Sequence, residues 1–468
     1  TRTAAENALD ILRDTEPELH LRSVTLTAKD KICLCETREC TPEACPYANG
    51  YYARIKGALW DVLDVPCLTA ETLQEYAKRH TVCPFELGLD SSLWSDVIIG
   101  DYNYLFDPVV HLVRFFESAG DYIFLVDEAH NLPGRAREMH SAALTKTSFY
   151  EAKKLLGKGK SSLKNALTKV NDVFIEWRHR AEEETAARDG RFGKTFFLKE
   201  RSEEFDHLLN RLCEPLEAWL DDHREPDETH TALLQLYFDV RAWLRVADTF
   251  DDHFVLQITA SGSEVRAAQL CLDPSAFLAD SFALGRAAVL FSATLAPASY
   301  YKDLCGVPEA RAVALRSPFP AGNQGLFCIG NVSTRYKDRD ASLAIVEESL
   351  ATMVRARCGN YLAFFPSYAY MEQAYAQFKE HCPEINCIKQ ENAMDEQQKA
   401  AFLAQFVPGP SQSLLGFAVM GGAFGEGVDL TGDRLIGVGI VGPGLPQVGP
   451  RQEQLRDYFE QTLSLIHI

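Results

Sequence analysis

The sequence holds 468 residues, of which 46% are hydrophobic and 24% charged, and its formal net charge is -19 at pH 7. That length predicts roughly three domains of about 100 to 200 residues each. No apolar run approaches the roughly 18 residues of a membrane span, and the N-terminus lacks a signal-peptide pattern, so we expect a cytoplasmic protein with no membrane partner. The acidic balance excludes a uniformly basic, DNA-coating surface, although it leaves room for a basic channel.

The first predicted element is a helix over residues 1–13, because Ala4, Ala8, Leu9 and Leu12 fall on one helical face. The pattern is already under way at residue 1, where there is no Met. We therefore expect the chain to be cut at the front.

Cysteines crowd the segment that follows, residues 31–95. Six of the 13 cysteines lie there, namely Cys33, Cys35, Cys40, Cys45, Cys67 and Cys83. The segment from Lys31 to Tyr52 has no sustained periodicity and little to bury. Because a cytoplasmic setting disfavours disulfides, such a segment calls for a metal ion or a cluster to hold it together.

Two Cys-Pro pairs, Cys45-Pro46 and Cys83-Pro84, resemble the end of iron–sulfur sequence runs. We expect a [4Fe–4S] cluster on Cys33, Cys40, Cys45 and Cys83, with Cys35 as the alternate for Cys33. Cys67 is the weakest candidate, since it lies between apolar helical stretches. A zinc site and purely structural cysteines remain the alternatives, although zinc ligands commonly come in pairs two to four residues apart.

A short strand over Val97–Ile99 precedes the most informative stretch, Tyr122–Leu132 (YIFLVDEAHNL). Tyr122–Val126 is typical of a buried strand of a parallel sheet, whose functional groups lie just past the strand's carboxyl end. Asp127 and Glu128 follow at that point. An aspartate that holds Mg²⁺ beside a glutamate that orients a water suits nucleotide hydrolysis, and His130 is placed to sense the phosphate. The alternative is that Asp-Glu only caps the next helix.

A helical insertion of about 120 residues is predicted next, from helical periodicity with glycine and proline breaks. Its expected helices are Met139–Leu156, Leu163–Ala187, Glu203–His223 and Thr229–Thr249. Phe254–Ile258 and Val265–Leu270 alternate like a hairpin. A pattern typical of a strand in a parallel sheet returns over Arg286–Leu295, which contains Ser292 and Thr294. Capping of the following helix is the preferred interpretation of these two hydroxyls.

A second α/β unit is predicted beyond Ser317, because strands and helices alternate. The expected strands are Tyr361–Phe365, Ile385–Ile388, Leu414–Met420 and Leu435–Val441, and the expected helices are Tyr368–His381 and Glu396–Phe406. A glycine-rich loop, Gly421–Asp429, follows the third strand and suits a close approach to phosphates or to a partner domain.

The order of DEAH, Ser-Ala-Thr and Gly-Glu-Gly-Val-Asp, with cysteines between the first helix and the DEAH, resembles the iron–sulfur superfamily 2 DNA helicases of the XPD/DinG type. The resemblance implies an α/β fold of two RecA-like parallel-sheet domains, with a cysteine-rich cluster domain and a helical arch inserted in the first. It maps helicase domain 1 onto residues 1–30, 96–139 and 273–316, the cluster domain onto 31–95, the arch onto 140–272 and helicase domain 2 onto 317–462.

By this resemblance Asp127 binds Mg²⁺, Glu128 activates the attacking water, and His130 couples hydrolysis to movement. Further coupling residues would be Ser292 and Thr294 in motif III and Glu426, Gly427 and Asp429 in motif V. The implied cofactors are ATP, Mg²⁺ and a [4Fe–4S] cluster. The implied partner is single-stranded or forked DNA, along which a monomer moves 5′ to 3′ in DNA repair or replication. Candidate DNA contacts are Thr3, Tyr102, Tyr104, Phe192, Phe196, Phe197, Lys199 and Ser367, with a core position as the alternative for each aromatic residue.

Two departures qualify the resemblance. No Gly-x-x-x-x-Gly-Lys-Ser/Thr P-loop is present, because Lys154 and Arg188 replace the first glycine of the two partial matches at Gly159 and Gly193. The arginine-bearing motif VI is absent, and residues 463–468 (LSLIHI) resemble a translated sequencing adapter, so we exclude them from the fold. We expect a fragment that is inactive as an ATPase by itself. A non-catalytic DNA-binding or scaffold protein that has lost its P-loop is the alternative, and an RNA helicase of the DEAH kind fits the cysteines poorly.

Overall fold

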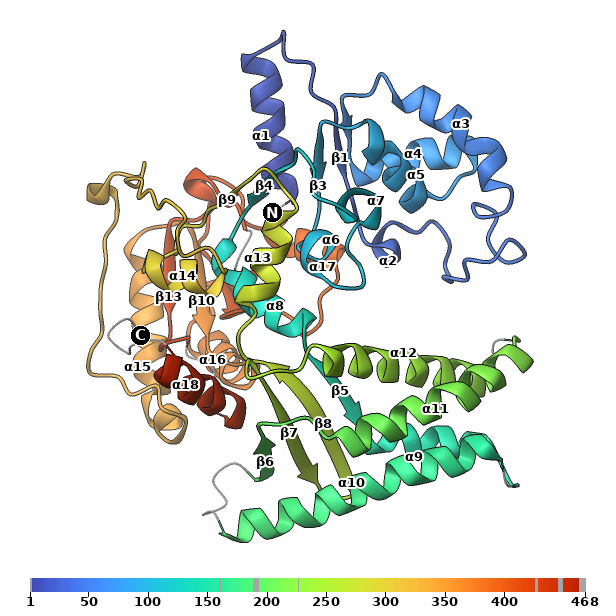
Figure 1. The fold of residues 1–468 in the computed structure, drawn as a ribbon. Helices are drawn as coiled ribbons and strands as arrows, with labels where there is room; N and C mark the ends of the chain where they lie inside the picture. Colours follow the sequence, from blue (N-terminus) through green and yellow to red (C-terminus); the bar gives the residue numbers. More distant parts are fainter. Residues whose placement is uncertain are drawn as a thin grey trace. The chain divides into compact units, whose positions relative to one another are not determined.

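The structure is a computed structural model that describes residues 2–159, 161–187, 193–225, 227–425, 428–444 and 449–462. The chain forms two compact units, residues 1–313 with 449–468 and residues 314–448 (Figure 1). Each unit contains parallel strands and helices and is described by itself. Within the described ranges, no helix has both the length and the apolarity that crossing a membrane requires.

The first unit begins with a parallel sheet of strand order β2-β1-β3. Its strands are β1 (Ser23–Thr25), β2 (Cys67–Leu68) and β3 (Val97–Ile99). The accompanying helices are α1 (Arg2–Thr15), α2 (Lys29–Ile32), α3 (Tyr51–Val62), α4 (Ala70–His80), α5 (Pro84–Ser91), η1 (Ser92–Trp94), α6 (Asn103–Phe106) and α7 (Val113–Phe116). Helix α1 is tied to the sheet by Arg13, whose guanidinium donates to Ser23 Oγ at 2.7 Å and to Pro66 O at 3.0 Å. The strand at 97–99 and the N-terminal helix are as predicted.

Cys67 corrects one expectation about the cysteine-rich segment. We placed it between helical stretches, whereas it starts strand β2 and pairs with Ser23 of β1. Local sequence patterns miss a strand of two residues, because its stability comes from a partner strand far away in the sequence. Helices α3, α4 and α5 pack on this sheet around Leu73, Ala77 and Leu87, which are almost fully buried.

The DEAH strand lies in a second sheet, in which β4 (Ile123–Val126) pairs in parallel with β9 (Ala287–Leu290). Phe124 and Val126 are buried against α6, α8 (Leu132–Met139) and α13 (Ser275–Ala283). Ile123 and Leu125, however, are 65% and 68% exposed. The expectation of a strand buried on both faces is therefore wrong within the described residues, because side chains alternate across a strand and only one face is covered.

The inserted region combines helices with an antiparallel sheet of order β5-β8-β7-β6. Its elements are β5 (Ala142–Thr145), α9 (Lys146–Leu155), α10 (Ser162–Ala187), β6 (Lys194–Leu198), α11 (Glu203–Asp222), α12 (Glu228–Asp248), β7 (Phe254–Ser261) and β8 (Glu264–Cys271). The long helices and the hairpin are as predicted. The expected helix over Met139–Leu156 is wrong in its first half, because residues 142–145 pair with β8 and take the extended conformation. Helix α14 (Ala298–Leu304) lies beyond β9, and α18 (Pro450–Thr462) also belongs to the first unit.

A carboxylate is buried in the helical core of this insertion. Asp206 on α11 is 6% exposed, and Oδ1 accepts a hydrogen bond of 2.8 Å from Trp243 Nε1 on α12. Oδ2 has no hydrogen-bond partner among the described residues, and its nearest cationic atom is Arg201 Nε at 4.0 Å. Burial raises the pKa of Asp206, although the Trp243 hydrogen bond and Arg201 oppose that rise.

We expect Asp206→Asn to stabilise the protein at pH 7, with a smaller gain at pH 4. Since the pKa of Asp206 is higher in the folded than in the unfolded state, its contribution to stability is full below the unfolded value of about 4 and is lost as pH rises through the folded value. Asparagine keeps an oxygen for Trp243 and carries no charge. Urea unfolding of both proteins from pH 4 to 7 measures the difference, and an asparagine variant less stable than the parent at pH 7 would contradict it.

The second unit is a four-stranded parallel sheet of order β11-β12-β10-β13. Its strands are β10 (Asn360–Phe365), β11 (Asn386–Lys389), β12 (Leu414–Val419) and β13 (Gly437–Ile440). Its helices are η3 (Ala321–Asn323), η4 (Tyr336–Asp338), α15 (Arg339–Ala356), α16 (Tyr368–His381), α17 (Glu396–Ala404) and η5 (Gly432–Arg434). The four predicted strands and the two predicted helices are confirmed to within a few residues at each end, whereas helix α15 was not predicted. The core contains Phe365 and Phe417, whose rings stack 5.7 Å apart.

Candidate functional site

The turn after β4 brings the acidic pair to the neighbouring strand β9. The parallel pairing continues past both strands, since Phe291 N donates to Val126 O at 3.0 Å and Ala129 N donates to Phe291 O at 3.1 Å. Glu128 takes a left-handed backbone conformation with φ +47°, which is uncommon for a residue with a side chain. Its amide donates to Asp127 Oδ1 at 2.8 Å. The turn therefore places Asp127, Glu128 and His130 beside residues 291–294.

Tyr102 of the preceding segment holds this turn from the other side. Its hydroxyl bonds to the backbone carbonyls of Asp127 and of Glu128, the latter at 3.0 Å. A half-buried phenol that bonds to the carbonyls of a tight turn restrains the backbone that carries the two carboxylates. Tyr102 thus acts as a positioning residue, a role that the sequence did not indicate.

The Ser292 hydroxyl forms hydrogen bonds with both Glu128 and His130. Its hydroxyl donates to Glu128 Oε2 at 3.1 Å, and His130 Nδ1 lies 2.7 Å from the same hydroxyl oxygen. Because the Ser292 proton is directed to Glu128, His130 Nδ1 is the donor to Ser292. His130 Nδ1 also lies 3.3 Å from Glu128 Oε2, so the three groups form a closed triangle.

Neither capping interpretation survives in the structure. Helix α14 starts at Ala298 and its N-cap is Pro297, so Ser292 and Thr294 do not cap it. Thr294 N instead donates to Ser292 Oγ at 3.2 Å and fixes the serine in the turn. Glu128 precedes a short 3-10 helix, η2 (Ala129–Asn131), and makes no side-chain cap. The side chains of Ser292, Thr294 and Glu128 therefore do not serve as helix caps, and they lie at the edge of the sheet.

Two family descriptions match separate parts of the chain: DEAD_2 matches residues 16–149, and the helicase C-terminal domain matches residues 350–464. They cover the DEAH turn in the first unit and the parallel sheet of the second. The chain belongs to the XPD/DinG type of superfamily 2 helicases. Its two parallel-sheet units are accordingly RecA-like helicase domains.

Curated relatives of this helicase chain share low identity over long alignments. The ATP-dependent DNA helicase CHL1 of Coccidioides immitis is 22% identical over 429 residues, covering 80% of this chain and 49% of that protein. The XPD subunit of general transcription and DNA repair factor IIH from Schizosaccharomyces pombe is 23% identical, covering 84% and 61%. The chain thus spans about half to three fifths of these relatives. A solved XPD helicase structure aligns with TM-score 0.54 and 18% identity, over 96% of this chain and 78% of that one, which supports the fold.

The residues predicted from the sequence to contact DNA are only partly exposed in the described part of the chain. Phe196 is fully buried in the core of the insertion, so its assignment to base stacking is wrong. Tyr102 holds the DEAH turn, and Tyr104 packs beside the core under β1. Lys199 is exposed. Phe192 and the side chain of Thr3 lie outside the described residues, and Phe197 packs against Val255 and Leu270.

In the second helicase domain, Ser367 caps helix α16, because its hydroxyl accepts from Tyr370 N at 3.4 Å. Arg339 Nη1 lies 3.5 Å from the same hydroxyl. Of the predicted motif V residues, Glu426 and Gly427 lie outside the described residues. Asp429 is exposed, and its carbonyl oxygen lies 3.5 Å from Arg434 Nη1.

Five of the six thiols of the cysteine-rich segment fall in two neighbourhoods, and the sixth, Cys67, lies in β2. Cys35 Sγ lies 3.8 Å from Cys45 Sγ, and burial, that contact and nearby Cys33 raise the pKa of Cys35 to about 11. Cys40 and Cys83 lie near the ammonium of Lys29, whose pKa is raised, although burial alone would lower it, because Glu86 and the two thiols surround it. Burial raises the pKa of Cys83, whereas the amides of Glu86 and Phe85 act in the opposite direction.

No three His, Cys, Asp or Glu side chains in the described ranges are arranged as a ready metal site. The donor chemistry nevertheless fits a thiophilic group: Cys33, Cys35, Cys40 and Cys45 lie on a stretch without regular structure between α2 and α3, and Cys83 follows at the start of α5. The structure adds weight to Cys35, the alternate ligand, because it neighbours both Cys33 and Cys45. Cluster binding stays a prediction.

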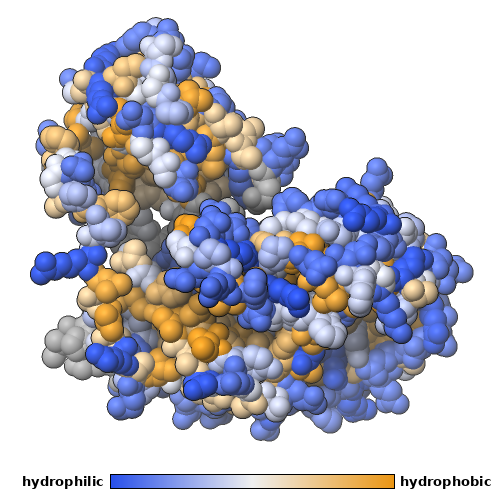
Figure 2. Space-filling view, turned by 90° about the horizontal axis from the view of Figure 1, so that it is seen from above, coloured by the Kyte–Doolittle hydropathy of each residue, from blue (hydrophilic) through white to orange (hydrophobic). Residues whose placement is uncertain are grey.

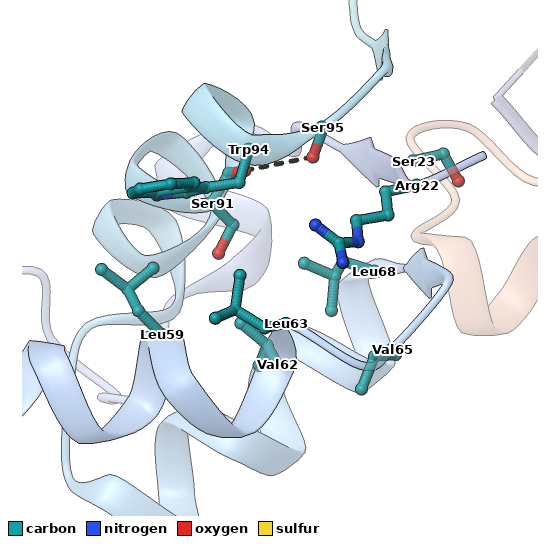
Figure 3. Close-up of a pocket in the computed structure, with 10 residues that line it drawn as sticks. All are labelled: Arg22, Ser23, Leu59, Val62, Leu63, Val65, Leu68, Ser91, Trp94 and Ser95. Carbon is teal, nitrogen blue, oxygen red and sulfur yellow. Dashed lines mark hydrogen bonds between the residues drawn. The ribbon is translucent and has the colours of Figure 1, made fainter. Parts of the chain in front are cut away.

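One pocket lies in the first unit, away from the DEAH turn. It has a volume of about 280 Å³, open to solvent, and lies between β1, α3 and the end of α5. Trp94 lies over Leu59 at one wall, and Arg22 and Ser91 point into the space (Figure 3). Ser91 Oγ has no hydrogen-bond partner among the described residues. None of its lining residues belongs to the Glu128 triangle, so the pocket is distinct from the site at the acidic turn.

Proposed function

We propose that this chain is the motor region of an ATP-dependent DNA helicase that moves 5′ to 3′ along single-stranded DNA and opens duplexes in repair or replication. The single observation that carries the proposal is the hydrogen-bonded triangle of Glu128, His130 and Ser292. A helicase of this superfamily must transmit the result of ATP hydrolysis to other parts of the protein. A serine that follows the neighbouring strand and hydrogen-bonds to the glutamate is placed to do so. Family membership and the parallel sheets support the same reading.

The proposed chemistry assigns one role to each residue of the turn. Asp127 would hold Mg²⁺, which when bound neutralises charge on the phosphates. Glu128, whose side chain is 47% exposed, would orient a water and accept its proton. Once protonated, Glu128 Oε2 is a poorer acceptor for Ser292, so the serine and His130 rearrange their bonds. The turn at residues 291–294 thereby registers the state of Glu128.

We further propose that Cys33, Cys40, Cys45 and Cys83, with Cys35 as the alternate for Cys33, hold a [4Fe–4S] cluster. A cluster would fasten a segment that has little regular structure between α2 and α3. The cytoplasmic location and the monomeric state remain predictions from the sequence. The domain boundaries predicted for the cluster and the arch are likewise part of this proposal.

A non-catalytic DNA-binding protein is the second candidate, since the 468 residues contain no P-loop to cradle phosphates. Sequencing the gene upstream of the Thr1 codon separates the two. A strand followed by Gly-Lys-Thr would support the helicase, and a start codon at that point would support the scaffold. We expect the 468 residues alone to turn over ATP no faster than their Glu128→Gln variant. Faster, Glu128-dependent turnover would show that a P-loop is dispensable here.

A further inference from the structure

Helix α3 carries an exposed stripe of two aromatic rings and a lysine. Tyr52 is 89% exposed and Trp60 is 75% exposed, and Lys56 lies between them at the surface. Residues four apart share a helical face, so the three side chains form one row about 12 Å long. Figure 1 shows α3 at the edge of the group formed with α4 and α5.

The opposite face of α3 holds the row in place. Tyr51, Ile55, Ala58 and Val62 are buried in the core beneath it. The Tyr51 hydroxyl donates to Asp90 Oδ2 at 2.9 Å, and its ring supports that of Tyr52 edge-on at 5.7 Å. Arg54 Nε donates to Thr81 O at 2.9 Å. The exposed rings are thus mounted on a fixed helix.

Apolar residues reach the surface in several places, as Figure 2 shows, and a single exposed ring indicates nothing by itself. The α3 row differs because a cation separates its rings. Lys56 takes part in no ion pair with a described residue, whereas the nearest acidic side chain on the helix, Asp61, is engaged by His80 Nε2 at 2.8 Å. Gly57 beside Lys56 is exposed, and a Cβ there would lie 3.7 Å from the His80 ring.

We infer that the α3 row is a stacking platform for unpaired nucleobases, in which Tyr52 and Trp60 each take one base and Lys56 pairs with a phosphate between them. Alternation of π-faces with positive charge is how proteins bind single strands without reading sequence. The inference rests on the proposed function, since it needs single-stranded DNA as the partner. None of these three residues was among the candidates that the sequence suggested.

The test is equilibrium binding of the full 468-residue chain to a fluorescent oligothymidylate without nucleotide. We expect Tyr52→Ala and Trp60→Ala each to weaken binding by about 5- to 150-fold, and Tyr52→Phe and Trp60→Phe to retain most of the affinity because a ring remains. Lys56→Gln should reduce the salt dependence of binding. Phe238→Ala, which removes a 56% exposed ring elsewhere, is the matched control and should leave affinity unchanged.

The unfolding midpoints of the variants should match that of the parent, because the replaced side chains are exposed. Unchanged affinity in both alanine variants, with binding by the parent intact, would overturn the platform and leave the helicase proposal standing. Loss of self-association in the variants with unchanged DNA affinity would assign the row to a second copy of the chain and overturn it too. No binding by the parent chain would overturn the platform and count against the helicase proposal.

Discussion

Glu128→Gln is expected to lower DNA-stimulated ATP turnover by about 10²- to 10⁴-fold in the product of the full reading frame. Glutamine preserves the size and the hydrogen bond from Ser292, but it accepts no proton from the attacking water. Binding of single-stranded DNA should be unchanged, since the side chain acts on the water. Steady-state turnover with and without oligothymidylate measures the effect.

Ser292→Ala is the matched variant, because it removes one corner of the triangle and leaves the carboxylate in place. We expect turnover to fall much less than in Glu128→Gln, while duplex unwinding per ATP consumed falls more. Equal losses of turnover and unwinding in Ser292→Ala would show that the serine serves hydrolysis alone. Turnover in Glu128→Gln close to that of the parent would remove Glu128 from its assigned role.

Protein purified without oxygen is expected to be brown and to contain iron, and Cys45→Ser is expected to lose both the colour and the iron. Cys45 is the informative position, because it neighbours Cys35 and is the cysteine of the Cys45-Pro46 pair on the stretch without regular structure. Since cluster binding and folding of this stretch are coupled, limited proteolysis should cut the variant between α2 and α3 much faster than the parent. Iron content and visible absorption are the primary measurements.

Cys67→Ser is the control for the cluster, since Cys67 sits in β2 and pairs with Ser23. It should keep its iron. Cys35→Ser and Cys33→Ser, compared side by side, decide which of the two thiols is a ligand. Colourless protein with stoichiometric zinc would refute the iron–sulfur assignment, and colourless protein without metal would make the cysteines structural.

The sequence predicted the strands of the second unit well, because the two central strands, β10 and β12, are nearly continuous apolar runs that the parallel sheet buries. Helix α15 was missed. Prediction from the sequence was less accurate where pairing with a strand far along the chain decides the local structure. The sequence pattern predicted a helix at residues 142–145, whereas the structure has strand β5 there. Pairing with β8 overrides the helical propensity of these residues. Cys67 and Leu68 are extended only because β1 is beside them.

At the candidate site, the sequence identified the acidic turn but not its connections. Nothing in Ser-Ala-Thr indicates that its serine reaches Glu128 and His130, because the contact depends on the register of β4 with β9. The role of Tyr102 was also hidden, since an aromatic residue near a helix start suits stacking as well as packing. Exposure separated Phe196 from Tyr52 and Trp60, and exposure is a property of the folded chain.

Strand β2 connects the cysteine-rich segment to the first parallel sheet. Pro66 O accepts from Ser23 N at 2.9 Å and from Arg13 on α1, so one short strand links the helices around α3 to both β1 and the N-terminal helix. If the α3 row binds single-stranded DNA as proposed, a force on its rings would be transmitted through this link to the sheet that contains β3. Excising residues 31–95 would therefore strip an edge from that sheet as well as removing the thiols.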